Sequence, residues 1–489
     1  MASYTIPTAT ASTTGTNTKK FRVLLIPYFA NSHIKPFTEL AISLVAANES
    51  VEVTVAVTPA NVSIVQSFLG CEHNPKPEAV KIVTYPFPTI EGIPQGVENA
   101  CKAGNQDVSS RFIEGSLTEE VMRPTHEALI RAQHANAIVN DMMFIWNSPV
   151  ADELSVPCVI FSVMGAFSTL AVRHLMDVVI DDINEVPEFP VPAIRIPRSE
   201  VPEFIRVNDC SYHRTMDSLQ ADCFGLAMNT SADLEKNYCD MYMRRGYVKR
   251  AYFLGPVALL HASCSQPPTA TATAGECYIM DWLDSKPNRS VVYLSFGTIA
   301  VVKDAQLEEI ALGLESSGHS FLWVVRGEWT PPRGWEERVQ DRGLIIKAWA
   351  PQTAILGHPA VGAFVTQCGW NSILETVAAG VPVLTWPIFY EQFITERQVT
   401  QVLGIGERLW PDGAGLRSET YQEHELVPAK DVARALTEFM RPGGLGDAAR
   451  IKVMDLAAKV RAAVVQGGSS HRDLHRLIDD LMAAAAKRI

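Results

Sequence analysis

The sequence predicts an α/β protein built from two doubly wound domains. The chain has 489 residues, which exceeds the usual size of one hydrophobic core. Short continuous apolar runs, typical of strands buried on both faces, alternate with segments of helical periodicity. A segment rich in Pro, Ser, Thr and Ala at 261–276 interrupts this alternation, which then restarts. Parallel strands joined by right-handed helical crossovers account for both halves.

The first half begins with FRVLLIPYF at 21–29, a run that predicts a buried strand. A helix is expected next, with Pro36 in its first turn, where a missing N–H costs nothing. Further strands are expected, in order, at 51–59, 79–87, 137–141 and 157–162.

The second half repeats this design after the interruption. Strands are expected at 290–297, 320–326, 343–350, 362–367 and 381–387, with a helix at 304–316. The end of the chain, 471–489, places Leu474, Leu477, Ile478 and Leu481 on one helical face, which must pack against another element. The expected limits are a disordered tail at 1–20, a first domain at 21–258, a linker at 259–276, a second domain at 277–468 and a final helix at 469–489.

Composition excludes several classes of function. Lys and Arg total 42 against 54 for Asp and Glu, a net charge of −12 without a basic run, so no nucleic-acid partner is expected. The nine cysteines are scattered and have no metal-ligand spacing, which favours reduced thiols and a cytoplasmic protein. The amino terminus lacks a signal-peptide pattern, and no apolar run reaches the length of a membrane span.

The motif QCGWNS, 367–372, lies between a predicted strand and a predicted helix that stops at Gly380. Gly369 would permit a tight turn, and Asn371 or Ser372 would cap the helix. The free N–H groups at such a helix start favour an anion, and a phosphate fits. The alternative is ordinary capping, in which Ser372 and Glu375 form an S-x-x-E capping box.

The surrounding segment, from WAPQ to FYEQ at 349–392, closely resembles the plant secondary product glycosyltransferase box of family 1 UDP-sugar-dependent glycosyltransferases. Weaker similarity extends over nearly the whole chain. The resemblance implies a GT-B fold, in which two Rossmann-like domains face each other across a cleft. The first domain would hold the acceptor and the second the UDP-sugar, while the last helix would cross back to the first domain. The implied reaction is inverting transfer of glucose from UDP-glucose to a hydroxyl of a small acceptor.

Carried over by position, the resemblance implies four kinds of donor contact. The uracil would meet Trp349 and Ala350, the ribose Gln352 and Glu375, the diphosphate Thr298, Asn371 and Ser372, and the sugar Trp370, Glu391 and Gln392. An indole offers a wide apolar platform for a base, and a carboxylate suits a vicinal diol. A terminal Gln in this box is associated with glucose as the donor sugar.

The sequence departs from the family pattern at three positions. Gln367 replaces the usual His near the diphosphate, and an amide can donate a hydrogen bond but brings no positive charge. Glu391 replaces the more frequent Asp and keeps the carboxylate. Ser32 occupies the position where a Gly often precedes the catalytic His, so the local turn is expected to differ.

His33 and Asp141 are the predicted catalytic residues. His33 lies between a buried strand and a helix start, where open α/β sheets form ligand crevices. An imidazole can accept the proton of a hydroxyl that attacks an anomeric carbon. Asp141 ends another apolar strand of the same domain and, by the resemblance, orients the imidazole. The alternative is that each residue only caps the helix that follows it.

No metal or other cofactor is expected, because the acidic residues form no D-x-D cluster suited to a divalent cation on a diphosphate. The phosphate-loop, dinucleotide and G-x-S-x-G motifs are absent from the sequence, which argues against an NTPase, a dehydrogenase and a serine hydrolase. A monomer is expected.

The acceptor pocket is expected to be lined by the first domain's loops at 86–94, 142–146, 162–167 and 180–205. Candidate lining residues are Phe87 and the adjoining Pro88, Met142, Phe144, Met164 and Phe389. Their apolar character favours a lipophilic acceptor such as a flavonoid or other phenolic. Terpenoid or steroid acceptors, C-glycosylation of a phenolic ring, and nucleotide-sugar binding with weak turnover remain alternatives.

Overall fold

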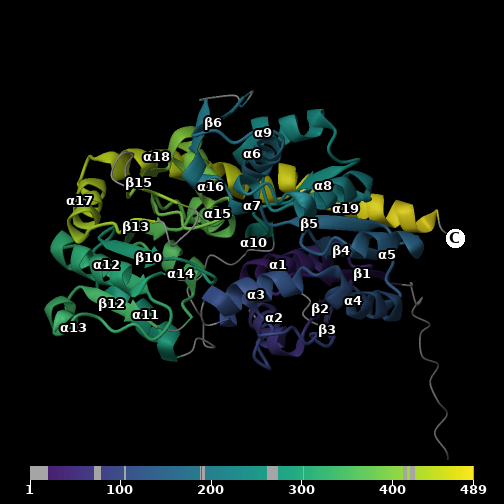
Figure 1. The fold of residues 1–489 in the computed structure, drawn as a ribbon, viewed down its shortest axis with the longest axis horizontal. Coiled ribbons are helices and arrows are strands. Elements are labelled where there is room, and N and C mark those ends of the chain that lie inside the picture. The colour runs from purple at the N-terminus through teal and green to yellow at the C-terminus, as the bar shows by residue number, and fades with distance from the viewer. Residues whose placement is uncertain are drawn as a thin grey trace, which may run out of the picture.

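The computed structural model describes residues 20–70, 79–103, 106–187, 189, 193–260, 274–300, 302–347, 349–410, 416–418 and 424–487. They form two α/β units, each centred on one parallel sheet (Figure 1). Most of the predicted tail and residues 261–273 of the predicted linker lie outside the described residues. The domain limits therefore stay a prediction, while the two-sheet architecture is confirmed.

The amino-terminal sheet has seven parallel strands in the order β3-β2-β1-β4-β5-β8-β9. These are β1 (Phe21–Ile26), β2 (Val51–Val57), β3 (Val80–Thr84), β4 (Ala137–Asp141), β5 (Cys158–Ser162), β8 (Gly225–Met228) and β9 (Ala251–Phe253). The chain builds outward from β1 to β3 and then returns to place β4 on the other side of β1. The carboxyl ends of β1 and β4 therefore flank the point where the winding direction changes, which is where such sheets bind ligands.

The carboxy-terminal sheet repeats this topology with six parallel strands in the order β12-β11-β10-β13-β14-β15. These are β10 (Val291–Ser295), β11 (Ser320–Val324), β12 (Gly343–Ile346), β13 (Val361–Thr366), β14 (Val383–Thr385) and β15 (Gly406–Arg408). Here β10 and β13 flank the change of direction, and their last residues, Ser295 and Thr366, are paired in register. A separate antiparallel hairpin joins β6 (Ile183–Val186) to β7 (Ile194–Pro197).

Helices connect the strands in both units. The amino-terminal half contains α1 (Asn31–Ala47), α2 (Val62–Leu69), α3 (Gln106–Ser116), α4 (Glu119–Gln133), α5 (Asn147–Glu153), α6 (Ala166–Met176), α7 (Glu203–Arg206), α8 (Ser211–Asp222), α9 (Ala232–Arg245), α10 (Val257–Leu260) and the short turns η1 (Pro59–Asn61), η3 (Ala100–Lys102) and η4 (Arg198–Glu200). The carboxy-terminal half contains α11 (Ala274–Asp284), α12 (Asp304–Ser317), α13 (Trp335–Val339), α14 (Gln352–Gly357), α15 (Trp370–Ala379), α16 (Gln392–Arg397), η5 (Gln398–Leu403), α17 (Ala429–Met440), α18 (Leu445–Val464) and α19 (Ser469–Ala486). Within the described ranges no helix is both long and apolar enough to cross a lipid bilayer.

Helix α1 begins earlier than the sequence predicted. It starts at Asn31, so Pro36 is its sixth residue and lies in the second turn, not the first. A proline at that position cannot donate the usual hydrogen bond to the carbonyl four residues before it, which here belongs to Ser32. The expectation was wrong because it relied on the preference of Pro for helix starts and ignored that a freed carbonyl can find another partner.

Helices α18 and α19, yellow in Figure 1, carry the end of the chain from the carboxy-terminal unit back to the amino-terminal sheet. The apolar face of α19 packs into the same cluster as β1, β2 and α1. Two of its carboxylates also bind the edge strand β9: Asp473 accepts from the Phe253 N–H at 2.7 Å, and Asp480 accepts from the Tyr252 hydroxyl at 2.7 Å. The amino-terminal core is therefore completed by the last helix of the chain.

Leu477 on α19 has no exposed surface, so Leu477→Ala should lower the free energy of unfolding by about 2–5 kcal/mol through lost burial and a cavity. Urea unfolding followed by circular dichroism measures this change. Ile451→Ala on α18 is the matched control, since Ile451 is 74% exposed and should change stability by less than about 0.5 kcal/mol. Equal effects of the two substitutions would show that α19 does not complete the core.

Candidate active site

His33 and Asp141 meet at the carboxyl end of the amino-terminal sheet. Strand β4 ends at Asp141, and the neighbouring strand β1 leads into the loop before His33. The Nδ1 atom of His33 lies 2.9 Å from Oδ2 of Asp141. Because a carboxylate can only accept, Nδ1 carries the proton and Nε2 presents a lone pair. The imidazole side chain is 15% exposed and the carboxylate is fully buried.

The buried Asp141 carboxylate is held by backbone groups as well as by the imidazole. Its Oδ2 accepts from the Tyr28 N–H at 3.0 Å, and its Oδ1 accepts from the Met143 N–H at 3.0 Å. A buried carboxylate needs such donors to offset the loss of water. The Tyr28 ring also packs edge-on against the His33 ring, with centroids 5.3 Å apart. These contacts fix both the position and the rotation of the imidazole.

The QCGWNS segment folds differently from the capping scheme that the sequence suggested. Helix α15 starts at Trp370 with Gly369 as its N-cap, and no side chain caps it. The left-handed residue is Cys368, with φ 69°, whereas Gly369 has an ordinary φ of −60°. The predictions of Gly369 as the tight turn and of Asn371 or Ser372 as the cap were wrong. The segment turns one residue earlier, because the Cys368 N–H is held at the strand end by the Thr366 hydroxyl.

The first turn of α15 leaves backbone N–H groups available. The Ile373 N–H bonds to the Gly369 carbonyl at 3.1 Å and opens the helical ladder, so the N–H groups of residues 370 to 372 precede it. Ser372 and Glu375 do not form a capping box. Instead, both side chains accept hydrogen bonds from Nε2 of Gln352, at 3.1 Å and 2.6 Å.

Gln352, Ser372 and Glu375, three of the predicted donor residues, are thus brought together. The Tyr293 hydroxyl adds a hydrogen bond to Oε1 of Gln352 at 3.2 Å. Trp349 lies just before Gln352 in the chain and is 61% exposed, unusual for an indole and suited to a stacking platform. Ala350 is largely buried. The predicted base and ribose contacts therefore occupy one edge of the carboxy-terminal unit.

Gln367 and the Gly297–Thr298 loop adjoin at the carboxyl ends of β13 and β10. Gly297 has φ 73°, which favours glycine, and a Cβ on it would lie 2.1 Å from Nε2 of Gln367, so a larger residue would displace this amide. The carbonyl of Thr298 accepts a hydrogen bond from Nη1 of Arg326 at 2.9 Å. Sequence reasoning missed Arg326, which has no motif of its own.

Trp370 and Asn371 contact the amino-terminal unit through their side chains. The Trp370 indole is buried and donates to the Asn229 carbonyl at 2.8 Å. The Asn371 Oδ1 accepts from Nδ2 of Asn229 at 3.0 Å, and its Nδ2 donates to the Ser32 carbonyl at 2.6 Å. These side chains are engaged between the units, which leaves their backbone N–H groups to face a donor. Nothing in the sequence signalled Asn229.

Helix α16 begins at Gln392, and Glu391 is its N-cap residue. The Oε1 atom of Gln392 accepts from the backbone N–H groups of Ile388 and Phe389, at 3.0 and 3.2 Å, so its amide nitrogen is left to donate. Burial raises the pKa of Glu391 to about 7, with smaller opposing contributions from a backbone hydrogen bond and from His33. Its carboxyl group therefore lies close enough to the imidazole to interact electrostatically.

A narrow cavity is lined by two of the predicted acceptor residues, Met164 and Met142, the latter next to Asp141 in the chain. Three more methionines, Met176, Met216 and Met228, line it. Its free volume of about 20 Å³ holds a water molecule but not a flavonoid. Methionine side chains change rotamer easily, so this wall can reshape around a rigid acceptor.

The other predicted acceptor residues lie elsewhere. Phe144 has no exposed surface and packs against Phe29 and His126, so it belongs to the core behind the pocket. Phe87 is partly exposed and stacks on Phe112. Phe389 packs on the carboxy-terminal core. Sequence reasoning missed His213 and Tyr390, which line the cavity and meet at 3.0 Å from opposite units.

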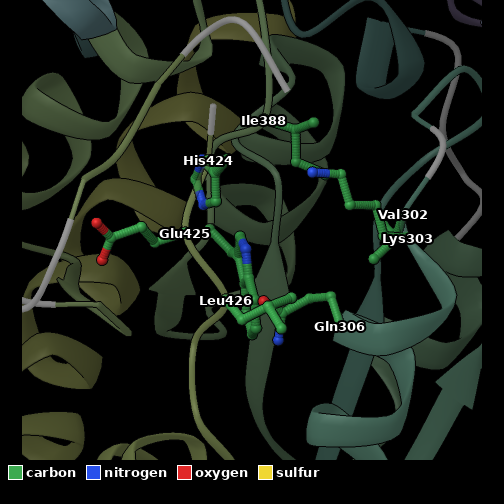
Figure 2. A pocket seen from close by; sticks show the side chains of 8 residues that line it. Val302, Lys303, Gln306, Ile388, His424, Glu425 and Leu426 are labelled. Carbon is green, nitrogen blue, oxygen red and sulfur yellow. The ribbon is translucent and has the colours of Figure 1, made fainter. Parts of the chain in front are cut away.

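Figure 2 shows a second pocket, in the carboxy-terminal unit, that contains none of the predicted site residues. It is lined by Val302, Lys303, Gln306, Trp386, Ile388, His424, Glu425 and Leu426. The Gln306 amide pairs there with the backbone of Val427: its nitrogen donates to the Val427 carbonyl and its oxygen accepts from the Val427 N–H. Across the described part of the chain, no three His, Cys, Asp or Glu side chains gather as a metal site would require.

Comparisons with known proteins show the family to which the chain belongs. Residues 209–408 match the family described as UDP-glucoronosyl and UDP-glucosyl transferase. A UDP-glucose flavonoid 3-O-glucosyltransferase 7 from Fragaria ananassa is 32% identical over 95% of this chain and 96% of its own length. An anthocyanin 3'-O-beta-glucosyltransferase from Gentiana triflora is also 32% identical, over 94% of this chain and 98% of its own.

Two crystal structures resemble the whole chain. UGT73P12 of Glycyrrhiza uralensis, complexed with glycyrrhetinic acid 3-O-monoglucuronide, superposes with a TM-score of 0.82 at 28% identity, covering 96% of this chain and 97% of that one. UGT71G1 of Medicago truncatula, complexed with UDP-glucose, superposes with a TM-score of 0.75 at 27% identity, covering 95% and 98%. The fold is therefore GT-B, as predicted.

The raised pKa of Glu391 predicts a stability change with pH. A folded-state pKa of about 7, above the unfolded value of about 4.3, means that the folded protein holds the proton more tightly. Stability from this group is present at low pH and is lost as pH rises toward 7. Glu391→Gln removes the titration, so its melting temperature relative to wild type should rise by about 1–4 °C between pH 5 and pH 8. A constant difference would contradict the shift.

Proposed function

The chain belongs to the family of plant UDP-glycosyltransferases, and from that premise we propose that it transfers glucose from UDP-glucose, with inversion, to a hydroxyl of a small lipophilic acceptor. A flavonoid or another phenolic is the proposed acceptor class. The observation that supports this most directly is the His33–Asp141 pair, 2.9 Å apart at the winding change of the first sheet, opposite the start of α15. A base on one unit thus faces an anion site on the other.

The proposed mechanism assigns the proton transfer to His33. Its Nε2 lone pair accepts the proton of the acceptor hydroxyl while the hydroxyl oxygen attacks the anomeric carbon. Asp141 holds the Nδ1–H and stabilises the imidazolium that forms. Attack from the face opposite UDP passes through an oxocarbenium-like transition state, and the configuration at the anomeric carbon inverts.

The leaving UDP is proposed to rest on uncharged donors. These are the free N–H groups of the α15 first turn, the Thr298 loop and the Gln367 amide. A helix start offers partial positive charge to a diphosphate, and preorganised donors stabilise charge as it develops. Gln352 and Glu375 are proposed to take the ribose hydroxyls, Trp349 and Ala350 the uracil, and Gln392, Glu391 and Trp370 the sugar, with no metal ion in these roles.

The acceptor class is supported by two observations. The curated relatives named above act on a flavonoid and an anthocyanin. Five methionines give the cavity an adaptable apolar wall, which suits a flat ring system, and polar side chains including His213, Gln220 and Tyr390 also line it. The direct test is to incubate the protein with UDP-glucose and a panel of flavonoids, simple phenolics, terpenoids and steroids, and to follow UDP release. Mass spectrometry and anomeric proton couplings then identify the product, and a failure to release UDP with any phenolic would contradict the proposal.

His33→Ala should lower the transfer rate by at least about 10²-fold, because no group remains to take the acceptor proton. The dissociation constant for UDP-glucose should stay within about threefold of wild type, since the imidazole acts on the acceptor. Steady-state kinetics and isothermal titration calorimetry measure the two quantities. His134→Ala, at an exposed histidine that ends α4, is the control. Loss of donor binding together with activity would count against His33 as the base.

Gln367→His should tighten donor binding by about three- to tenfold at low salt, if the charge missing from this position matters to the diphosphate. Calorimetry with UDP at pH 6 and pH 8 separates the charged from the neutral imidazole. The gain should be greater at pH 6, where more of the imidazole is protonated. If the ratio of the wild-type to the Gln367→His dissociation constant is the same at both pH values, the charge on the imidazole does not contribute to UDP binding.

A further inference from the structure

Lys35 reaches from the base-bearing helix into the predicted ribose site. It lies two residues after His33 on α1, and its ammonium group forms an ion pair with Oε1 of Glu375 on α15. The same nitrogen lies 3.3 Å from the Thr353 hydroxyl, also in the carboxy-terminal unit. The Lys35 side chain is 24% exposed and the Glu375 side chain 9%. The pair therefore lies at the boundary between the units, partly shielded from water.

Two side chains bind the Glu375 carboxylate, and its oxygens can still accept further hydrogen bonds. Lys35 bonds to Oε1, and Gln352 bonds to Oε2 at 2.6 Å. Each carboxylate oxygen can accept two hydrogen bonds, so each retains one position for a further donor. A vicinal diol could take both positions at once without displacing Lys35.

Charge gives a reason for a cation at this place. A carboxylate beside an anionic diphosphate would repel it unless the negative charge is offset. Gln367 carries no positive charge that could offset the Glu375 carboxylate. The Arg326 guanidinium donates to the Thr298 carbonyl instead of to Glu375. Glu39, on the same helix as Lys35, lies 3.9 Å from the ammonium group, and burial raises the pKa of its carboxyl to about 7. Near neutral pH, the Glu39 carboxyl is therefore only partly ionised, and it competes only in part with Glu375 for the Lys35 ammonium group.

We propose that Lys35 is a donor-site positioning residue supplied by the acceptor-binding unit. It holds the Glu375 carboxylate toward the ribose hydroxyls and offsets its charge against the diphosphate. This inference rests on the proposed function, since it takes Glu375 as the ribose contact.

The test compares Lys35→Met with Lys236→Met, a matched loss of an exposed lysine on α9. Calorimetry with UDP at 50 and 300 mM NaCl should show about tenfold weaker binding for Lys35→Met at low salt, and a smaller penalty at high salt. Lys35→Arg should stay within about threefold of wild type because it keeps the charge. The KM for UDP-glucose should rise in Lys35→Met, while the acceptor KM and kcat at saturating donor stay within about threefold.

Two results would overturn the inference. An unchanged dissociation constant in Lys35→Met would show that the ion pair has no role in donor binding, and tighter binding would show that Lys35 obstructs the ribose site. If Lys35→Met lowers the melting temperature, Lys35→Gln replaces it. Binding of UDP by wild type and Lys236→Met shows that the donor site exists, so failure of the Lys35 inference alone is distinguishable. Failure of wild type to bind UDP would overturn the proposed function and this inference together.

Discussion

The Asn371 side chain joins the two units at the point on which the active site depends. Its Nδ2 donates to the Ser32 carbonyl, and its Oδ1 accepts from Asn229. The Ser32 carbonyl is available because Pro36, four residues later, has no N–H to donate to it. The carbonyl that lacks an intrahelical donor in α1 is thus hydrogen-bonded by a residue of the opposite unit. The hydrogen bond between Asn371 and Ser32 holds the first turn of α1, which carries His33, against the first turn of α15.

A second set of buried polar contacts fixes the relative orientation of the units. Arg397, on α16, donates to Glu200 of the amino-terminal unit at 2.5 Å, and both side chains are nearly inaccessible. Arg417 lies 3.3 Å from Glu200 and also pairs with Glu396. Burial favours the neutral form of Glu396, but the guanidinium groups of Arg417, Arg408 and Arg397 outweigh this and lower its pKa. Buried pairs of this kind add little net stability, but they penalise any arrangement that leaves one charge unpartnered.

Glu235 lies at the same boundary, at the start of α6, the helix whose Thr169 lines the proposed acceptor cavity. Its carboxylate accepts from the N–H groups of Ala166 and Phe167 at the start of α6, and from Nε2 of Gln398 in η5. The amino-terminal end of α6 is therefore positioned by a carboxylate that also contacts the other unit. Gly165, just before α6, admits the Trp370 indole, because a Cβ there would lie 2.9 Å from the ring. The starts of α6 and α15 are consequently placed by shared contacts.

The sequence by itself determined strands β1 to β5 and β10 to β14, the doubly wound design and the residues at the carboxyl ends of these strands. The short strands β8, β9 and β15, the β6–β7 hairpin and the order of the strands came only from the structure. Buried parallel strands are continuous apolar runs, and local periodicity records them. His33 and Asp141 were paired in advance by the family resemblance, and the structure added that the strands before them, β1 and β4, are neighbours. Only the tertiary structure decided the start of α15, the partner of the Ser32 carbonyl and the position of Phe144 in the core. The contact of Lys35 with Glu375 was likewise hidden, although Lys35 stands two residues from His33. The Ser32 and Lys35 contacts join groups 339 and 340 residues apart, and such contacts produce no periodic pattern in the sequence. The start of α15 depends on a side-chain hydrogen bond at the strand end, which hydrophobic periodicity does not record either.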